Sequence, residues 1–357
     1  MSEPTGRRAV WTEERGAPAT SDEGRRHVKA PGSEWGNRDL GLAEARTLVR
    51  RAVDKAEQLG VRGAVAVVGA TGTLVTASRM DAGGPGGMTR ARSKAWISAT
   101  QQIPSAEHLH RMTTIAPPVA AGFAAASPEA VFPGAGGLPV SAGGVVVAGI
   151  AASGATVSPF FPAGVDPRVV SAGGAPANPE DLLIAYALGI PYAGQHGDDR
   201  KRWEQRFGDL VVDPADSLGM APAPPASRQA QLDWAMALCD AAMNEAARQG
   251  VRVAVAVTDP GGDPIQQDLM DGGPAGGVAV AQAVAGAAAL FDCRSGELDS
   301  LFGRAEAVAS LVVPPVLGVP GGLPVRVAGR VAAGLGVGGG PPAQCEEIAR
   351  AALGAGA

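Results

Sequence analysis

Large aromatic rings are scarce in this chain. Phe, Trp and Tyr make up 4% of the 357 residues, whereas 46% of the residues are apolar. A core with so few rings must be filled mainly by alanine, valine and leucine. Glycine (51) and proline (29) are abundant, which indicates a globular chain with many tight turns. The length is enough for two or three ordinary domains.

Cysteine is rarer still, with three residues. Cys239, Cys293 and Cys345 are far apart and show no C-x-x-C spacing. We therefore expect buried thiols in a reducing compartment rather than a disulfide framework. The pair Arg7-Arg8 is not followed by the apolar core that an export signal requires. These observations predict a cytoplasmic location.

Long apolar runs and an excess of positive charge are also missing. No apolar stretch reaches the roughly 18–20 residues needed to span a bilayer. The formal net charge is −5, so no broad basic surface suggests nucleic acid. We expect a small-molecule ligand, with neither a membrane nor nucleic acid as partner.

What the chain does contain is an internal repeat. Residues 43–67 align with residues 233–257 at a constant offset of 190, and SRMDAGGPGGMTRARSKA (78–95) has a near copy, DLMDGGPAGGVAVAQAVA (268–285). The motif GGLPV also occurs twice, at 136–140 and 321–325. We infer a duplication. It divides the chain into a disordered amino-terminal arm at 1–38, a first copy at 39–189 with an insertion at about 155–176, a linker at 190–228, and a second copy at 229–357.

Each copy predicts the same order of elements. An amphipathic helix with apolar residues three and four apart is followed by a β-hairpin of alternating Val and Ala around a glycine turn. A second helix is expected at about 88–102 and 278–291, then three strands and a last helix that begins with acidic residues in the first copy. The pattern favours an α/β (α+β) fold.

The ordered signature resembles the GlcG/HbpS family, which includes the carboxy-terminal domain of PduO-type proteins. It consists of Arg79-Met80-Asp81, a glycine-rich turn, Lys94-Ala95 and Gly136-Gly137-x-Pro139-Val140. The resemblance covers both copies. It implies two tandem domains, each an antiparallel sheet flanked by helices with a profilin-like build. It also implies haem as cofactor and a homo-oligomer, here a dimer of two-domain chains.

The two copies differ at two positions that carry a positive charge in the first copy. Leu269 stands in place of Arg79 and Val284 in place of Lys94. The first copy is therefore expected to keep the ligand site, and the second to be degenerate. Asp81 and Asp271 persist in both copies, which predicts a structural role, such as accepting backbone N–H bonds from the glycine turn at the start of the second helix.

Two of the four histidines are candidates for the site. His108 and His110 lie in SAEHLHRMTT, where the resemblance implies a pocket, whereas His27 and His196 lie in the arm and the linker. A neutral imidazole of His108 or His110 could ligate haem iron, while Arg79 and Lys94 neutralise the propionates. In a helix at most one of the two could face a given site, and in a strand both could.

Other readings remain open. Arg79 could pair structurally with Asp81 or Glu107, and the histidines could lie at a surface helix end. The chain could be an enzyme for a small carboxylate or aromatic acid, held by Arg79 and Lys94, with His108 or His110 as general base and the insertion with Phe160 and Phe161 as a lid. It could also be a non-catalytic assembly protein. The sequence shows no zinc-site spacing, no GK[ST] ending of a P-loop and no G-x-S-x-G frame at Ser153.

Overall fold

A computed structural model describes residues 40–114, 117–127, 129–155, 170–172, 175–192, 229–302 and 315–354. Both copies of the repeat are largely covered. The arm at 1–38, nearly all of the linker, most of the insertion with Phe160 and Phe161, and also His27 and His196, lie outside the described residues. No described helix is both long enough and apolar enough to cross a bilayer.

The first copy begins with a helix and a hairpin, as the repeat predicts. Its elements in chain order are α1 (Leu42–Leu59), β1 (Ala64–Gly69), β2 (Leu74–Arg79), α2 (Gly87–Thr100), α3 (Ser105–Thr114), α4 (Pro117–Ala126), β3 (Gly137–Ala142), β4 (Val145–Ser153), β5 (Val170–Ala172), β6 (Ala175–Ala177) and α5 (Pro179–Leu188).

The second copy follows the same order. Its elements are α7 (Ala230–Arg248), β7 (Ala254–Thr258), β8 (Pro264–Leu269), α8 (Gly277–Phe291), the 3-10 turn η4 (Ser295–Glu297), α9 (Leu298–Phe302), β9 (Gly322–Val327), β10 (Arg330–Gly338) and α11 (Pro342–Gly354). The expectation of three strands before the last helix was wrong: in the described residues each copy adds two strands to the main sheet there, and the first copy has a further short hairpin, β5–β6. In the first copy β5 and β6 pair only with each other, in the insertion.

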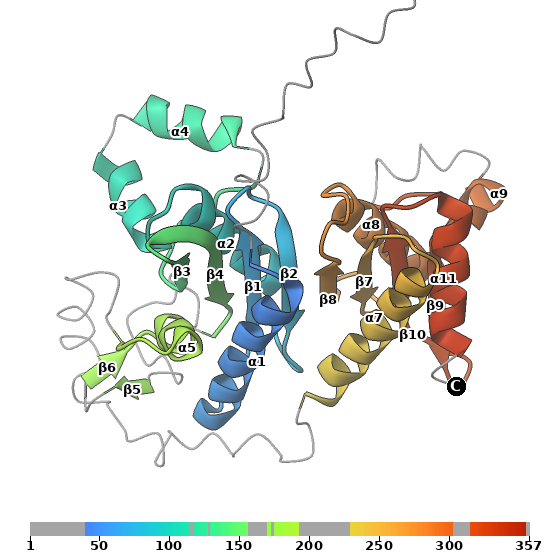
Figure 1. Cartoon of the computed structure of the whole chain (residues 1–357), viewed down its shortest axis with the longest axis horizontal. Helices are drawn as coiled ribbons and strands as arrows, with labels where there is room; N and C mark the ends of the chain where they lie inside the picture. The colour runs from blue at the N-terminus through green and yellow to red at the C-terminus, as the bar shows by residue number, and fades with distance from the viewer. Residues whose placement is uncertain are drawn as a thin grey trace, which may run out of the picture. The chain divides into compact units, whose positions relative to one another are not determined.

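All other described strands form one antiparallel sheet in the order β3-β4-β1-β2-β8-β7-β10-β9. Each copy contributes four neighbouring strands, and the two sets meet where β2 pairs with β8 (Figure 1). Thr76 lies opposite Asp268 and Ser78 opposite Gln266 in this pairing. The fold is thus a tandem pair of α+β domains whose strands continue into one sheet.

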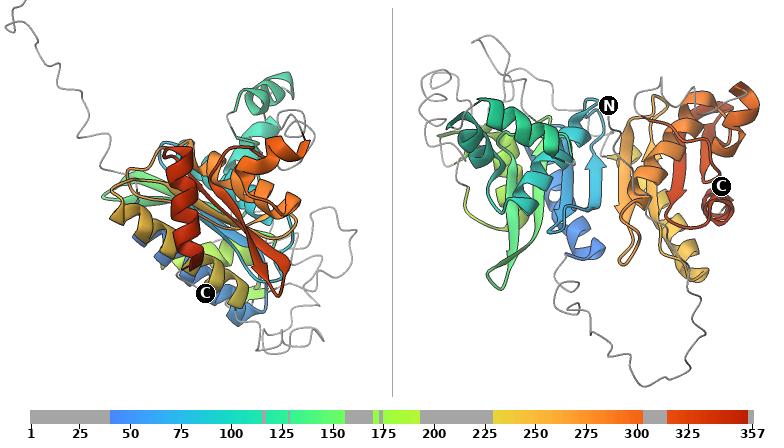
Figure 2. Two further views of the ribbon diagram at one scale, coloured as in Figure 1. Left: turned by 90° about the vertical axis from the view of Figure 1, so that its right-hand side faces the viewer. Right: turned by 90° about the horizontal axis from the view of Figure 1, so that it is seen from above.

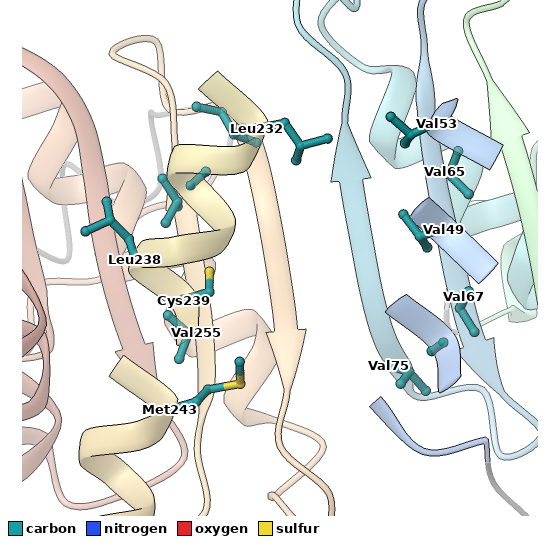
Figure 3. Close-up of a cluster of buried hydrophobic side chains, with 14 of the residues drawn as sticks. Val49, Val53, Val65, Val67, Val75, Leu232, Leu238, Cys239, Met243 and Val255 are labelled. Atoms are coloured by element: carbon teal, nitrogen blue, oxygen red, sulfur yellow. The ribbon is translucent and has the colours of Figure 1, made fainter. Parts of the chain in front are cut away.

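Helices cover both faces of the sheet (Figure 2). α2 and α8 pack on one face, and α1, α5, α7 and α11 pack on the other. Figure 3 shows the second face, where Val49 and Val53 of α1 and Cys239 and Met243 of α7 are among the buried apolar side chains.

Glycine lets α2 and α8 lie very close to the strands beneath them. A Cβ added at Gly149 of β4 would lie 2.2 Å from the carbonyl oxygen of Ala95, and one at Gly334 of β10 would lie 2.0 Å from that of Ala285. Real side chains do not approach a backbone oxygen so closely. The scarcity of rings and the wealth of glycine and alanine therefore suit a sheet on which helices rest almost backbone to backbone.

The repeated aspartates hold the two copies together by exchanging helix caps. The Asp81 carboxylate accepts hydrogen bonds from the backbone N–H groups of Gln231 (3.1 Å) and Leu232 (3.0 Å) at the start of α7. In return, Asp271 accepts one from Leu42 N (3.0 Å) at the start of α1. The predicted role as acceptor of N–H groups at a helix start was right in kind. The prediction of which helix is capped was wrong, because each aspartate caps the first helix of the other copy.

Candidate functional site

Arg79 lies at the end of β2 and points to the second copy. Its Nη2 lies 2.6 Å from Asp259 Oδ2, its Nε lies 3.4 Å from Asp263 Oδ2, and its Nε also donates to the Pro264 carbonyl. Burial raises the pKa of Asp263, while the nearby Arg79 acts in the opposite direction. Arg79 is thus used structurally, although its partners are neither of the two residues considered from sequence. The guanidinium is neutralised by the turn between β7 and β8.

Lys94 is buried in the first copy, where it forms an ion pair. Its Nζ lies 2.5 Å from Glu180 Oε2 of α5 and donates to the Ala152 carbonyl at 3.3 Å, and the residue is 3% exposed. The Phe132 ring completes the surroundings, with its centroid 5.6 Å from Nζ. Glu180 also accepts a bond from Gly154 N through Oε1.

The structure therefore does not form the basic cavity that the sequence suggested. Arg79 takes its carboxylates from the second copy and Lys94 takes its carboxylate from α5, so among the described residues the two cations share no partner. In the second copy Val284 replaces Lys94, and Cys345 stands where Glu180 does, since Gly321 faces Cys345 as Gly136 faces Glu180. Both charges of the pair are lost together, which identifies the pair as one unit.

A serine hydroxyl fixes the loop before β3 in the first copy and, in the same way, the loop before β9 in the second. Ser105 Oγ donates to the Gly134 carbonyl and accepts from Gly137 N. Ser295 Oγ donates to the Val319 carbonyl (2.6 Å) and accepts from Gly322 N (2.8 Å). Ser105 and Ser295 are 190 residues apart, so the offset of the repeat extends into α3. On this alignment Leu298 stands where His108 does.

His108 is a buried imidazole without a full set of hydrogen bonds. The residue is 5% exposed, and no described group pairs with its Nε2 atom. Its ring centroid lies 5.2 Å from that of Phe123 in α4. Burial, and to a smaller extent the positive charge of Arg111, lower the pKa of His108. The imidazole is therefore neutral at neutral pH, which leaves a nitrogen lone pair available.

His110 lies on the same helix, but its side chain is outside the described part of the structure. The segment is helical, and in a helix at most one of the two histidines can face a given site. His108 is the histidine whose surroundings can be described.

The helix that covers His108 is unusually apolar for its position. α4 has the sequence PPVAAGFAAA, without a charged residue, and Val119 is 60% exposed. In Figure 1, α4 lies beyond α3, away from the sheet. Phe123 is its contact with His108. One side of the imidazole is thus covered by a ring of a short apolar helix.

Several residues of this region were not singled out from the sequence. Phe123 and Phe132 carry no periodic signal, and only the fold brings them to His108 and Lys94. Glu180 could have been found, because its replacement by Cys345 follows the same asymmetry that pointed to Lys94. Among the described residues no three His, Cys, Asp or Glu side chains are grouped as a metal site.

Comparison with known proteins gives one family and several structures. The model of the family described as "Haem degrading protein HbpS-like" matches residues 40–159 and 231–354. The chain is similar to a crystal structure of a double mutant of Streptomyces reticuli HbpS, with 30% identity over 35% of this chain and 84% of that chain and a TM-score of 0.33. It is also similar to a PduOC–haem complex, with 25% identity over 34% of this chain and 89% of that chain and a TM-score of 0.32. No curated protein matches the chain.

Proposed function

On the premise that the chain belongs to the family of haem-degrading, HbpS-like proteins, into which both of its copies fall, we propose that it binds haem in its first copy. The observation that carries the proposal is the unpaired Nε2 atom of buried His108. Leaving such a group without a partner costs roughly 1–3 kcal/mol. The second copy avoids this cost with Leu298, so the fold does not require histidine there.

The residues around His108 fit such a group. His108 would hold the iron through Nε2, and Phe123 with the rest of apolar α4 would contact a face of the macrocycle. Phe123 would have to turn away for the iron to approach, since its ring packs on the imidazole. Bound haem supplies its own redox and oxygen chemistry. The protein's part is to keep His108 neutral and to exclude water from its surroundings.

We assign no propionate contact to Arg79 or Lys94. Each is already neutralised by carboxylates of the chain, and displacing a buried partner is costly. The same observation removes the support for an enzyme that holds a small carboxylate between these cations. A cytoplasmic location and a dimer of two-domain chains stay predictions.

The test is a haemin titration of the full chain, followed by its absorption spectrum. Wild type is expected to shift the Soret band with one haem per chain. His108→Leu places the residue of the second copy at this position and is expected to remove the shift or the spectral signature of histidine ligation. The matched control is His110→Ser, which likewise introduces the residue of the second copy, Ser300. It should behave like wild type. An unshifted wild-type spectrum, or identical spectra for wild type and His108→Leu, would reject the proposal.

A further inference from the structure

Every described ion pair between the two copies runs in the same direction. We call the contact across β2–β8 and between the side chains of α1 and α7 the join. In each pair at the join the first copy supplies arginine and the second supplies aspartate. These pairs are Arg46 with Asp240 and Asp268, Arg50 with Asp233, and Arg79 with Asp259 and Asp263.

Asp268 is the centre of this arrangement. Its residue is fully buried, and its carboxylate accepts from Arg46 Nε (3.1 Å), Arg46 Nη2 (2.8 Å) and Thr76 Oγ1 (2.9 Å). Gln266 of its own strand donates to both oxygens. A buried carboxylate that lost its cation would be strongly disfavoured.

Two other sets of contacts at the join are nearly symmetric. Backbone pairing of β2 with β8 needs no particular side chain, and the caps from Asp81 and Asp271 occur in both directions. A pair of two first copies or of two second copies could make the same contacts. These contacts stabilise a pair of copies but do not distinguish a like pair from an unlike pair.

From this contrast we infer that the join is a recognition surface that accepts only the unlike half. In a pair of two first copies, Arg46 would face Arg50 and Ser78, because these stand at the repeat positions of Asp240 and Asp268. Like charges would meet with no acid to neutralise them.

A pair of two second copies would fail for the opposite reason. Met236 stands at the repeat position of Arg46, so two buried Asp268 carboxylates would have no cation. The partner of each surface is therefore the other half, from the same chain or by exchange from a second chain. Discrimination comes from penalties on the wrong pairs as well as from contacts in the right one. Each pair then contains one copy with His108 and one with Leu298.

The direct experiment asks which halves pair when they are free to choose. A protease site is inserted into the full chain between residues 193 and 228, and the cut protein is unfolded in urea, refolded and analysed by native mass spectrometry. Pairs of unlike halves are expected to exceed like pairs by about tenfold or more. A statistical mixture, in which about half of the pairs are alike as an unbiased join requires, would overturn the inference.

Two sets of variants separate recognition from strength. Arg46→Met with Asp268→Ser gives each side the residue of the other copy and is expected to let like pairs form. Asp81→Ala with Asp271→Ala removes the symmetric caps, so it should weaken the pair without changing the proportion of like pairs. Like pairs that increase as much in the cap variant would contradict the assignment.

The intact chain provides a measurement that needs no refolding of separate halves. Arg46→Met and Asp268→Ser are combined in a double-mutant cycle on the urea-unfolding equilibrium. Each single variant leaves one charge without its main partner. If the two residues are coupled, the unfolding equilibrium constant of the double variant should be about tenfold or more below the value obtained by multiplying the effects of the two single variants. Effects that multiply within about twofold would show that the two residues are not coupled.

Discussion

The Nζ atom of Lys94 lies 2.5 Å from the carboxylate of Glu180, and both side chains are buried. The second copy has Val284 and Cys345 at these positions and folds in the same way. A buried ion pair is weak evidence for stability when its apolar replacement serves equally well. Its loss as a unit in one copy indicates that the two charges depend on each other.

We expect Lys94→Val alone to lower the free energy of unfolding by about 3–5 kcal/mol, because buried Glu180 would lose its ion pair with Lys94. Adding Glu180→Cys should restore most of the loss, since the pair then matches Val284 and Cys345 of the second copy. Urea unfolding of the two single variants and the double variant measures this. A double variant as unstable as the sum of the single effects would show that the residues act separately.

Much of the fold follows from the repeat in the sequence. The constant offset of 190 predicted the duplication, and the spacing of apolar residues in residues 43–67 predicted α1 and α7. Charge and glycine patterns placed α2 and α8 within about two residues of where they lie. The three strands expected before the last helix were not found: each copy adds two described strands to the main sheet, and the first copy's insertion forms the separate hairpin β5–β6.

The candidate site was harder to predict, for a physical reason. Sequence asymmetry correctly marks Arg79 and Lys94 as special to the first copy, but it does not say what neutralises a cation. The acid beside Arg79 lies 180 residues away in the turn at Asp259, and the acid beside Lys94 lies 86 residues away in Glu180. Only tertiary structure brings them together. The contact of His108 with Phe123 of α4 likewise could not be predicted from local sequence spacing.

The exchanged helix caps make a second prediction. Asp81→Ala removes the acceptor of two backbone N–H groups at the start of α7, and Asp271→Ala removes the acceptor of one at α1. Neither helix has a side-chain cap from its own preceding residue. Loss of a cap lowers stability by about 0.5–2 kcal/mol, and we expect Asp81→Ala to have the larger effect. Thermal unfolding with Asp54→Ala as control, an exposed aspartate of α1, checks this. Equal effects of all three substitutions would contradict it.

Gly149 and Gly334 make a third prediction, from the close packing of α2 and α8. An added methyl group at either position would meet a helix carbonyl oxygen, so the helix would have to move. Gly149→Ala or Gly334→Ala should lower the free energy of unfolding by about 1–3 kcal/mol or more. Gly122→Ala in α4 is the matched control, because nothing lies within 4 Å of its added Cβ. It should raise helix stability by up to about 1 kcal/mol. Substitutions with the same sign at all three positions would disprove the packing argument.

The pH dependence of stability gives a test of His108 that needs no haem. Burial, with a smaller contribution from Arg111, lowers the pKa of His108 in the folded state. In the unfolded chain its pKa is about 6.5. Between these values the unfolded state binds more protons than the folded state, so stability rises with pH in this window and falls as the solution is acidified. The part of the stability that depends on neutral His108 is fully present above the pKa of the unfolded chain and is lost as the pH falls below it.

We therefore expect wild type to lose more stability than His108→Leu when the pH falls from about 7.5 to about 5, across the range where a histidine titrates. At the higher pH the leucine variant should be as stable as wild type or slightly more stable, because it removes an unpaired buried nitrogen. Urea unfolding of both proteins at several pH values measures the difference, with His110→Ser as control for a general effect of removing a histidine. Parallel pH profiles for wild type and His108→Leu would mean that His108 is protonated as easily in the folded protein as in the unfolded chain. In that case it would not be the neutral, enclosed imidazole that haem ligation requires.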